Sequence, residues 1–148
     1  MPYKAYIGWS SKPFQGETIT IDNNGDRVHD VPVDKSKKSV YFFGGSTMWG
    51  GGAPDNGTIP ALFSSISGMP SYNKGEQGFN SRQGIARLVN LLAQGEKMDI
   101  VIFYDGVNDV GTSCRAELEV NEHSKTEIMR KRIQEGSLNG SIPCYHVT

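Results

Sequence analysis

"SVYFFGGSTMWG", which spans residues 39–50, decides the fold of this 148-residue chain. Its first half contains the continuous apolar run Val40–Phe43, which is typical of a strand that is covered on both faces. Two glycines then lead to Ser46, so this serine lies where the strand ends and a helix can begin. Taken alone, the stretch fits either a nucleophile presented at a strand end or a polar residue in a tight turn.

Two further strands are predicted downstream, at "PSYN" (residues 70–73) and at "DIVIFY" (residues 99–104). We expect the second of them to be buried. Each follows a segment with helical periodicity, and strands that alternate with amphipathic helices favour a parallel sheet with helices on its faces. In such sheets, ligands bind beyond the carboxyl ends of the strands, where the three glycine-containing loops of this chain lie.

The two predicted helices have recognisable ends. Thr58 can cap the first helix, and Gly68 can end it. Ser81 is the expected cap of the second helix, which Gly95 should end. The apolar residues at helical spacing should face the core. They are Leu62, Phe63 and Ile66 in the first helix and Ile85, Leu88, Val89 and Leu92 in the second.

The chain divides into two parts. Residues 1–38 should form an N-terminal arm or hairpin packed on the main domain, with a short strand in "ETITID" (residues 17–22). Residues 39–148 should form an incomplete α/β domain, because only sparse apolar residues follow Gly111 and no fourth apolar strand is found. The third strand is therefore expected to have an open edge, which a second copy of the chain could cover.

Composition excludes several classes of function. The formal net charge of −1 gives no basic excess, so we expect no nucleic-acid partner. No apolar run is long enough to span a membrane, and no signal core is found at the N-terminus, which predicts a cytoplasmic protein. Cys114 and Cys144 are interpreted as free thiols, and a single disulfide between them is the alternative. We expect no cofactor and no metal.

Three loops could carry chemistry together. Ser46 supplies a hydroxyl, which needs a base before it can act as a nucleophile. Gly78 in the second loop can offer a backbone N–H, and Asn108 in the third loop offers a side-chain amide. Such donors can stabilise the negative charge that develops on an attacked carbonyl.

These blocks resemble the SGNH (GDSL-type) hydrolase family. "FFGGSTMWG" is similar to its first block, with Ser46 at the nucleophile position and G-G-S in place of the usual G-D-S. "YNKGEQGFNSRQGIARL" resembles the second block, with Gly78 at the oxyanion glycine, and "YDGVNDV" resembles the third, with Asn108 at the oxyanion asparagine. The resemblance covers about half of the chain and implies a flavodoxin-like three-layer α/β/α sandwich with a short parallel sheet.

The sequence departs from the family at its end. The family's last block, D-x-x-H, carries the base histidine and its orienting aspartate, and no such block is found here. His146 is the residue nearest to the expected place, but Pro143 stands where the aspartate should be. His29 and His123 are interpreted as surface residues. We therefore interpret the domain as C-terminally truncated, with His146 as the weakest member of the predicted site.

Other polar residues of the loops have two interpretations each. Asp105 and Asp109 could form a metal pair, or they could cap local turns and helix starts. Glu76 could be an acid or base, or a solvated loop residue. The remaining candidates are Trp49 and Phe79, as pocket lining or as packing, and Arg82 and Arg87, as solvated helix residues.

The leading hypothesis for function is a serine esterase that acts on a small acyl ester, on a carbohydrate or a lipid. Ser46 would attack, and the N–H groups of Ser46 and Gly78 and the amide of Asn108 would hold the oxyanion. The alternative is a catalytically degenerate or truncated SGNH-like module with a binding or structural role. A glycine loop that cradles an anion is a further alternative, although no G-x-x-x-x-G-K-[ST] motif is present.

Overall fold

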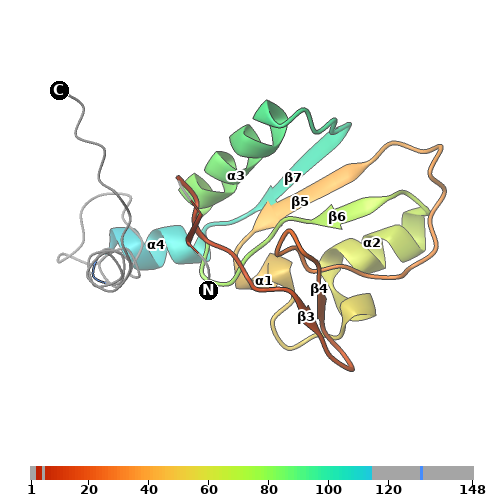
Figure 1. The fold of residues 1–148 in the computed structure, drawn as a ribbon, viewed down its shortest axis with the longest axis horizontal. Helices are drawn as coiled ribbons and strands as arrows, with labels where there is room; N and C mark the ends of the chain where they lie inside the picture. Colours follow the sequence, from red (N-terminus) through yellow and green to blue (C-terminus); the bar gives the residue numbers. More distant parts are fainter. Residues whose placement is uncertain (1–2, 5, 115–130, 132–148) are drawn as a thin grey trace, which may run out of the picture.

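A computed structural model describes residues 3–4, 6–114 and 131, and it is an α/β fold with a small parallel sheet (Figure 1). The sheet of the described residues has the strand order β6-β5-β7, with β5 (Val40–Gly44) at its centre. β6 (Ser71–Asn73) and β7 (Ile100–Tyr104) flank it, both parallel to it. The three predicted strands and their parallel arrangement are therefore confirmed.

The two faces of the sheet follow from the alternation of side chains along β5. Val40 and Phe42 pack with residues of the α2 side, where the ring centroid of Phe42 lies 5.3 Å from that of Phe63. Phe43 points the other way and stacks on Phe103 of β7, with the ring centroids 5.1 Å apart. All five residues of β5 are buried, as a continuous apolar run predicts.

Helices α2 (Ile59–Ser67) and α3 (Ser81–Ala93) lie on opposite sides of the sheet (Figure 1). Thr58 caps α2 by accepting a hydrogen bond from the backbone of Ala61, and Gly68 ends α2 in the left-handed conformation, as predicted. The cap of α3 is Asn80 and not Ser81. Asn80 and Gln83 form a reciprocal capping box, which places the start of the helix one residue earlier than a Ser81 cap would.

The remaining elements are short. The predicted strand at residues 17–22 is reduced to two residues, which pair with an equally short strand to make an antiparallel hairpin. A second antiparallel pair precedes it. These elements are β1 (Tyr3–Lys4), β2 (Gly8–Trp9), β3 (Phe14–Gln15), β4 (Thr20–Ile21), α1 (Ser46–Trp49), the 3₁₀ helix η1 (Asp55–Gly57) and α4 (Val107–Ser113).

A buried charge cluster, made of Asp26, Lys74 and Arg87, joins the N-terminal arm to the main body. The Asp26 carboxylate accepts hydrogen bonds from the Lys74 ammonium, at 2.5 Å, and from the Arg87 guanidinium. Arg87 also donates to the carbonyl oxygen of Lys74 at 2.9 Å. The prediction that Arg87 is solvated is therefore wrong, because its charge is compensated by a carboxylate 61 positions earlier in the chain.

Two more buried polar residues reinforce this attachment. Arg27 donates to the carbonyl oxygens of Gly50 and Ala53, both at 2.5 Å, and its side chain forms an ion pair with Asp55. Glu76 is fully buried, and its carboxylate accepts hydrogen bonds from the backbone N–H and the hydroxyl of Ser11. Glu76 is thus neither a solvated loop residue nor placed to act as an acid or base, because it holds the arm.

The predicted burial of β7 is wrong for the described residues. Val101 is 36% exposed, Phe103 40% and Tyr104 57%, because β7 is an edge strand of this sheet. The expected core face of α3 is also outside, since Ile85, Val89 and Leu92 are exposed while Gln83, Gly84 and Arg87 are buried. Apolar side chains therefore remain uncovered along one side of the described part.

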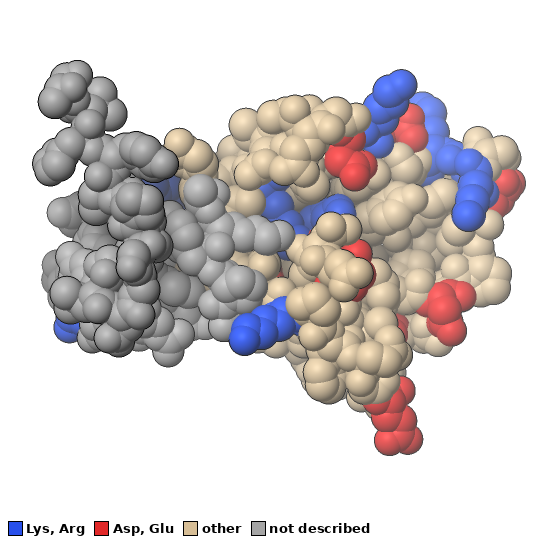
Figure 2. All heavy atoms as spheres, in the orientation of Figure 1, with Lys and Arg blue, Asp and Glu red and all other residues tan. Residues whose placement is uncertain are grey.

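Charges of both signs are interspersed over the described surface in the view of Figure 2. Basic side chains are also visible in a hollow near the middle of this view. Within the described part of the chain, no helix combines the length and the apolarity needed to cross a membrane.

The buried charge cluster leads to a prediction on stability. We expect Asp26→Asn to lower the free energy of unfolding by about 3–5 kcal/mol, because it leaves two buried cations without their carboxylate. Urea unfolding followed by circular dichroism measures the change. Asp30→Asn is the control, since Asp30 is exposed, and it should change the free energy by less than about 0.5 kcal/mol. Equal effects of the two substitutions would contradict a structural role for the cluster.

Candidate functional site

A small pocket of about 110 Å³ lies at the carboxyl ends of β5 and β7. Ser46, the first residue of α1, and Asn108 of α4 both line it. The structure therefore brings these two predicted site residues to one place, and Ser46 is partly accessible there. The lining residues are Gly45, Ser46, Thr47, Phe79, Tyr104, Asp105, Gly106, Val107 and Asn108.

Two glycines allow the loops to come this close. A Cβ atom on Gly44 would collide with the carbonyl oxygen of Tyr104 in the neighbouring strand. A Cβ atom on Gly45 would lie 2.7 Å from the Asn108 side-chain nitrogen and 3.0 Å from the Phe79 carbonyl oxygen. A Cβ atom essentially never lies closer than 3.0 Å to another atom, so the Asn108 side chain would have to shift, and the Phe79 carbonyl would have to give slightly. The two glycines before Ser46 thus permit the close approach of β7 and Asn108.

Asn108 links the second and third loops. Its side-chain Nδ2 donates a hydrogen bond of 2.6 Å to the carbonyl oxygen of Phe79. This bond holds the amide beside Gly45 and the start of α1, where the first turn of a helix leaves backbone N–H groups without partners in the helix. The arrangement places hydrogen-bond donors of two loops around the pocket.

Gly78 is next to the pocket but is not one of the residues that line it. Its φ of +76° lies in the left-handed region, which glycine adopts at little cost. The following residue, Phe79, lines the pocket, while its buried ring packs edge-on against Trp9 with the ring centroids 5.5 Å apart. Both the backbone interpretation of Gly78 and the packing interpretation of Phe79 therefore have a structural basis.

His29 lies at the far end of the sheet from Ser46. Its Nε2 is 3.1 Å from the hydroxyl of Ser71, which pairs with the first residue of β5, whereas Ser46 follows the last. Since the backbone N–H of Val31 donates to Nδ1, the ring carries its hydrogen on Nε2 and donates to Ser71. His29 is half-buried, not a surface residue as predicted, and this burial lowers its pKa.

Several predicted residues lie outside the described part of the chain. These include His123 and His146, so the structure places neither relative to Ser46. The same holds for Cys144, whereas Cys114 is described as an exposed free thiol. His29, the one histidine among the described residues, does not line the Ser46 pocket.

Asp105 and Asp109 have different environments. The Asp109 carboxylate accepts hydrogen bonds from the backbone N–H and the hydroxyl of Ser81, at 3.1 and 2.5 Å, which confirms its role at a helix start. Asp105 lines the pocket, and its buried Oδ2 has no hydrogen-bond partner among the described residues. Burial, with a smaller contribution from Asp109, raises the pKa of Asp105.

The interpretation of the two aspartates as a metal pair gains no support from the described residues. No group of three or more histidine, cysteine, aspartate or glutamate side chains converges there in a way that could hold a metal ion. The desolvation of Asp105 could not be read from the sequence, because it arises from packing of the strand end against α3 near Gly84. The only feature of the sequence that pointed to Asp105 was the position of this carboxylate directly after an apolar strand.

Comparisons with known proteins give a distant similarity to neuroligin-3. The chain is 32% identical over 149 residues to neuroligin-3 of Homo sapiens and 31% identical over 149 residues to neuroligin-3 of Rattus norvegicus. Each match covers 88% of this chain but only 17% of neuroligin-3. The chain thus spans about a sixth of the length of these curated relatives. No family model matches the chain.

These matches correct one expectation and qualify another. Neuroligins are membrane-anchored synaptic cell-adhesion proteins, so the prediction of a cytoplasmic protein is wrong. They also have an α/β-hydrolase fold and resemble carboxylesterases, which agrees with the α/β class of the described residues. The SGNH resemblance has no counterpart among the matches.

The close approach at Gly45 yields a prediction. We expect Gly45→Ala to destabilise the fold by about 1–3 kcal/mol, because the added methyl group must displace Asn108 or the Phe79 carbonyl. Gly111→Ala is the control, since a Cβ atom at Gly111 in α4 meets nothing within 4 Å. That substitution should stabilise the helix by up to about 1 kcal/mol. Thermal unfolding of the two variants should move in opposite directions, and a neutral Gly45→Ala would refute the contact.

The two ends of β7 predict opposite effects of pH. The raised pKa of Asp105 means that the folded state holds its proton more tightly, so stability falls as pH rises above about 3.8 through the raised pKa. Hydrogen bonds from Ser39 lower the pKa of Asp99, so its contribution is present at neutral pH and is lost as pH falls. At pH 7, Asp105→Asn should therefore stabilise the protein and Asp99→Asn should destabilise it.

Urea unfolding at several pH values between 3 and 8 measures both effects. The difference between wild type and Asp105→Asn should shrink as pH falls, because the wild-type carboxyl is then protonated as well. A difference that is the same at all these pH values would show that Asp105 is not desolvated in the folded state.

Proposed function

We propose that this chain is a catalytically degenerate SGNH-like module, whose pocket at Ser46 binds small acyl esters without hydrolysing them at an enzymatic rate. In this proposal, Ser46 keeps the nucleophile position, and the backbone N–H of Ser46, that of Gly78 and the amide of Asn108 keep the oxyanion positions. We also propose that the α/β fold with its small parallel sheet is a three-layer SGNH-type sandwich.

The proposal rests on one observation, the shared position of Ser46 and Asn108. Ser46 and Asn108 come from separate sequence blocks, and they line one pocket whose close packing depends on Gly45. A carbonyl oxygen placed there would have a hydroxyl on one side and an amide donor on the other. Such a pocket suits the planar, polar group of an ester, with room for only a small acyl chain in about 110 Å³.

The described residues place no histidine near Ser46, and this argues for the degenerate form. Ser46 must lose its proton as it attacks, and His29 is bound to Ser71 at the other end of the sheet. A serine hydrolase that lacks a triad member keeps only about 10³–10⁴-fold catalysis over water, which comes from the oxyanion hole and binding. This is far below the 10⁶-fold or more, roughly, of working enzymes.

The similarity to neuroligin-3 supports the same form. Neuroligin is an esterase-like adhesion protein that is catalytically inactive. The similarity covers most of this chain, although it covers only 17% of the relative. It therefore favours a binding role over hydrolysis and says nothing about which ligand is bound.

A second candidate is an active serine esterase whose base comes from outside the described residues. His146, or a histidine of a second copy docked on the exposed edge of β7, would then take the Ser46 proton. The exposed Val101, Phe103 and Tyr104 support association along that edge. The attacking oxygen would form the acyl ester, and the proton would pass through the histidine to the leaving alcohol.

A reactivity experiment separates the two candidates. Wild type and Ser46→Ala are treated with a fluorophosphonate probe, and their hydrolysis of p-nitrophenyl acetate is followed over a range of protein concentrations. The proposal predicts slow labelling that depends on Ser46, and turnover that is equal in the two proteins. Circular dichroism of both proteins controls for folding.

Two other results would each overturn the proposal. Turnover that depends on Ser46 and reaches about 1 s⁻¹ or more would establish the active esterase, and a rate per chain that rises with protein concentration would place the base on a second copy. A folded protein without any labelling at Ser46 would instead refute the nucleophile position itself.

A further inference from the structure

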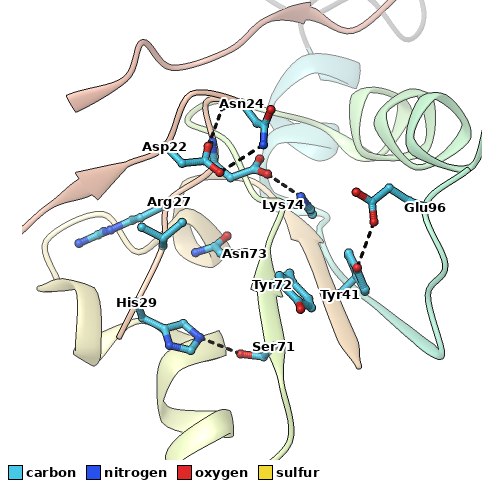
Figure 3. Close-up of a pocket in the computed structure, with 12 residues that line it drawn as sticks. Asp22, Asn24, Arg27, His29, Tyr41, Ser71, Tyr72, Asn73, Lys74 and Glu96 are labelled. Carbon is cyan, nitrogen blue, oxygen red and sulfur yellow. Dashed lines mark hydrogen bonds and ion pairs between the residues drawn. The ribbon is translucent and has the colours of Figure 1, made fainter. Parts of the chain in front are cut away.

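A second cavity, which we name the tyrosine groove, lies away from the Ser46 pocket. It has a volume of about 380 Å³, within the usual range for small-molecule sites, and it lies between residues 22–29 of the arm and the α3 side of the sheet. Figure 3 shows its labelled side chains. The ones that matter most here are Tyr41, Tyr72, Asp22, Asn24 and Glu96.

The floor of the groove is aromatic. Tyr41 of β5 and Tyr72 of β6 stack with their ring centroids 4.6 Å apart and their planes at 28°. Tyr41 is buried, whereas Tyr72 is 45% exposed, so a single ring offers the accessible apolar surface. Arg27 also lines the cavity, but its side chain points away from the tyrosine pair in Figure 3.

The rim of the groove offers hydrogen-bond acceptors. Asp22 and Glu96 form no ion pair among the described residues, although the Glu96 carboxylate accepts a hydrogen bond of 3.3 Å from the Tyr41 hydroxyl. Burial and the nearby Glu96 raise the pKa of Tyr41 to about 12, so this hydroxyl remains a donor. The Asn24 side chain adds an amide within 3.4 Å of Asp22.

The charges of the groove disfavour ionic ligands. Its cations are already paired, Lys74 with Asp26 and Arg27 with Asp55, so an anion would meet the carboxylates of Asp22 and Glu96, which accept hydrogen bonds but form no ion pair among the described residues. A cation would have to approach the Lys74 ammonium, which lies 5.8 Å from the centroid of the Tyr41 ring. A neutral ligand with hydroxyl donors and one apolar face avoids both costs.

We propose that the tyrosine groove binds a pyranose sugar, whose C–H face stacks on Tyr72 while its hydroxyls donate to Asp22 and Glu96. Sugars combine an apolar face with a dense ring of donors, and aromatic rings beside paired carboxylate and amide groups match both. The adjoining cavity of about 210 Å³ shares Asn24, Asp26, Lys74 and Glu96 with the groove, and it offers room for a second sugar unit beside the first. The site does not depend on ester binding at Ser46.

NMR titration of the ¹⁵N-labelled chain tests this binding. The probes are the methyl pyranosides of glucose, galactose, mannose and N-acetylglucosamine, each added to tens of millimolar. We expect at least one of them to shift the backbone signals of Tyr72 and Glu96 and the side-chain amide of Asn24, with a dissociation constant of roughly 1–10 mM. Ser46→Ala should bind the same sugar equally, which separates this site from the Ser46 pocket.

Two substitutions test which side chains of the groove bind the sugar. Tyr72→Leu, which keeps an apolar side chain but removes the ring, should weaken binding at least tenfold, and Glu96→Gln should weaken it less. Phe14→Leu is the matched control, because Phe14 is also an exposed aromatic residue of a strand and lies outside the groove, so binding should not change. Circular dichroism and urea unfolding confirm that each variant folds.

Three outcomes would overturn the proposal. No shift with any of the four pyranosides would exclude a sugar site in the groove. Shifts at the same residues with tetramethylammonium alone, or with inorganic phosphate alone, would identify a cation or an anion site instead. Binding that survives Tyr72→Leu in full would show that the sugar lies elsewhere.

Discussion

The carboxylate of Asp26, buried between Lys74 and Arg87, is the interaction on which the rest of the structure depends. Two cations that are taken out of water are costly unless a partner compensates them, and that partner comes from the N-terminal arm. The arm is therefore bound to the loop after β6 and to α3 by charge as well as by packing. Its next residue, Arg27, extends the attachment to the loop after α1.

This attachment places one segment of the arm between two distinct cavities. On one side, Arg27 fixes the loop that follows Ser46 through the carbonyl oxygens of Gly50 and Ala53. On the other side, residues 22–29 form a wall of the tyrosine groove. The arm thus contributes to the shape of both sites. A loss of the arm should disturb the Ser46 pocket even though the arm provides none of its lining residues.

Local sequence patterns predicted the framework well. The apolar run at Val40–Phe43, the cap at Thr58 and the glycine at Gly68 depend on neighbouring residues alone, and the structure contains all three features. The meeting of Ser46 and Asn108 followed from topology, because the carboxyl ends of adjacent parallel strands share one edge of a sheet. Whether these residues act as a catalytic site stays a prediction.

Long-range pairing explains what the sequence did not reveal. Arg87 and Glu76 were interpreted as solvated because charged residues usually are, yet their partners lie 61 and 65 positions away in the arm. The exposure of β7 and of the apolar stripe of α3 had no local signal either, since periodicity shows which residues share a face but not what covers it. The tyrosine groove was missed for the same reason, because Tyr41 is part of an otherwise apolar strand.

The geometry of the Ser46 pocket is the central claim, and a crystal structure of the chain with a small phosphonate bound covalently to Ser46 tests it most directly. The phosphonyl oxygen stands in for the oxyanion of an attacked ester. It should lie about 2.7–3.1 Å from the Asn108 side-chain nitrogen and from a backbone N–H of the first or second loop. A phosphonyl oxygen that points into solvent, with no hydrogen bond from Asn108, would contradict the claim.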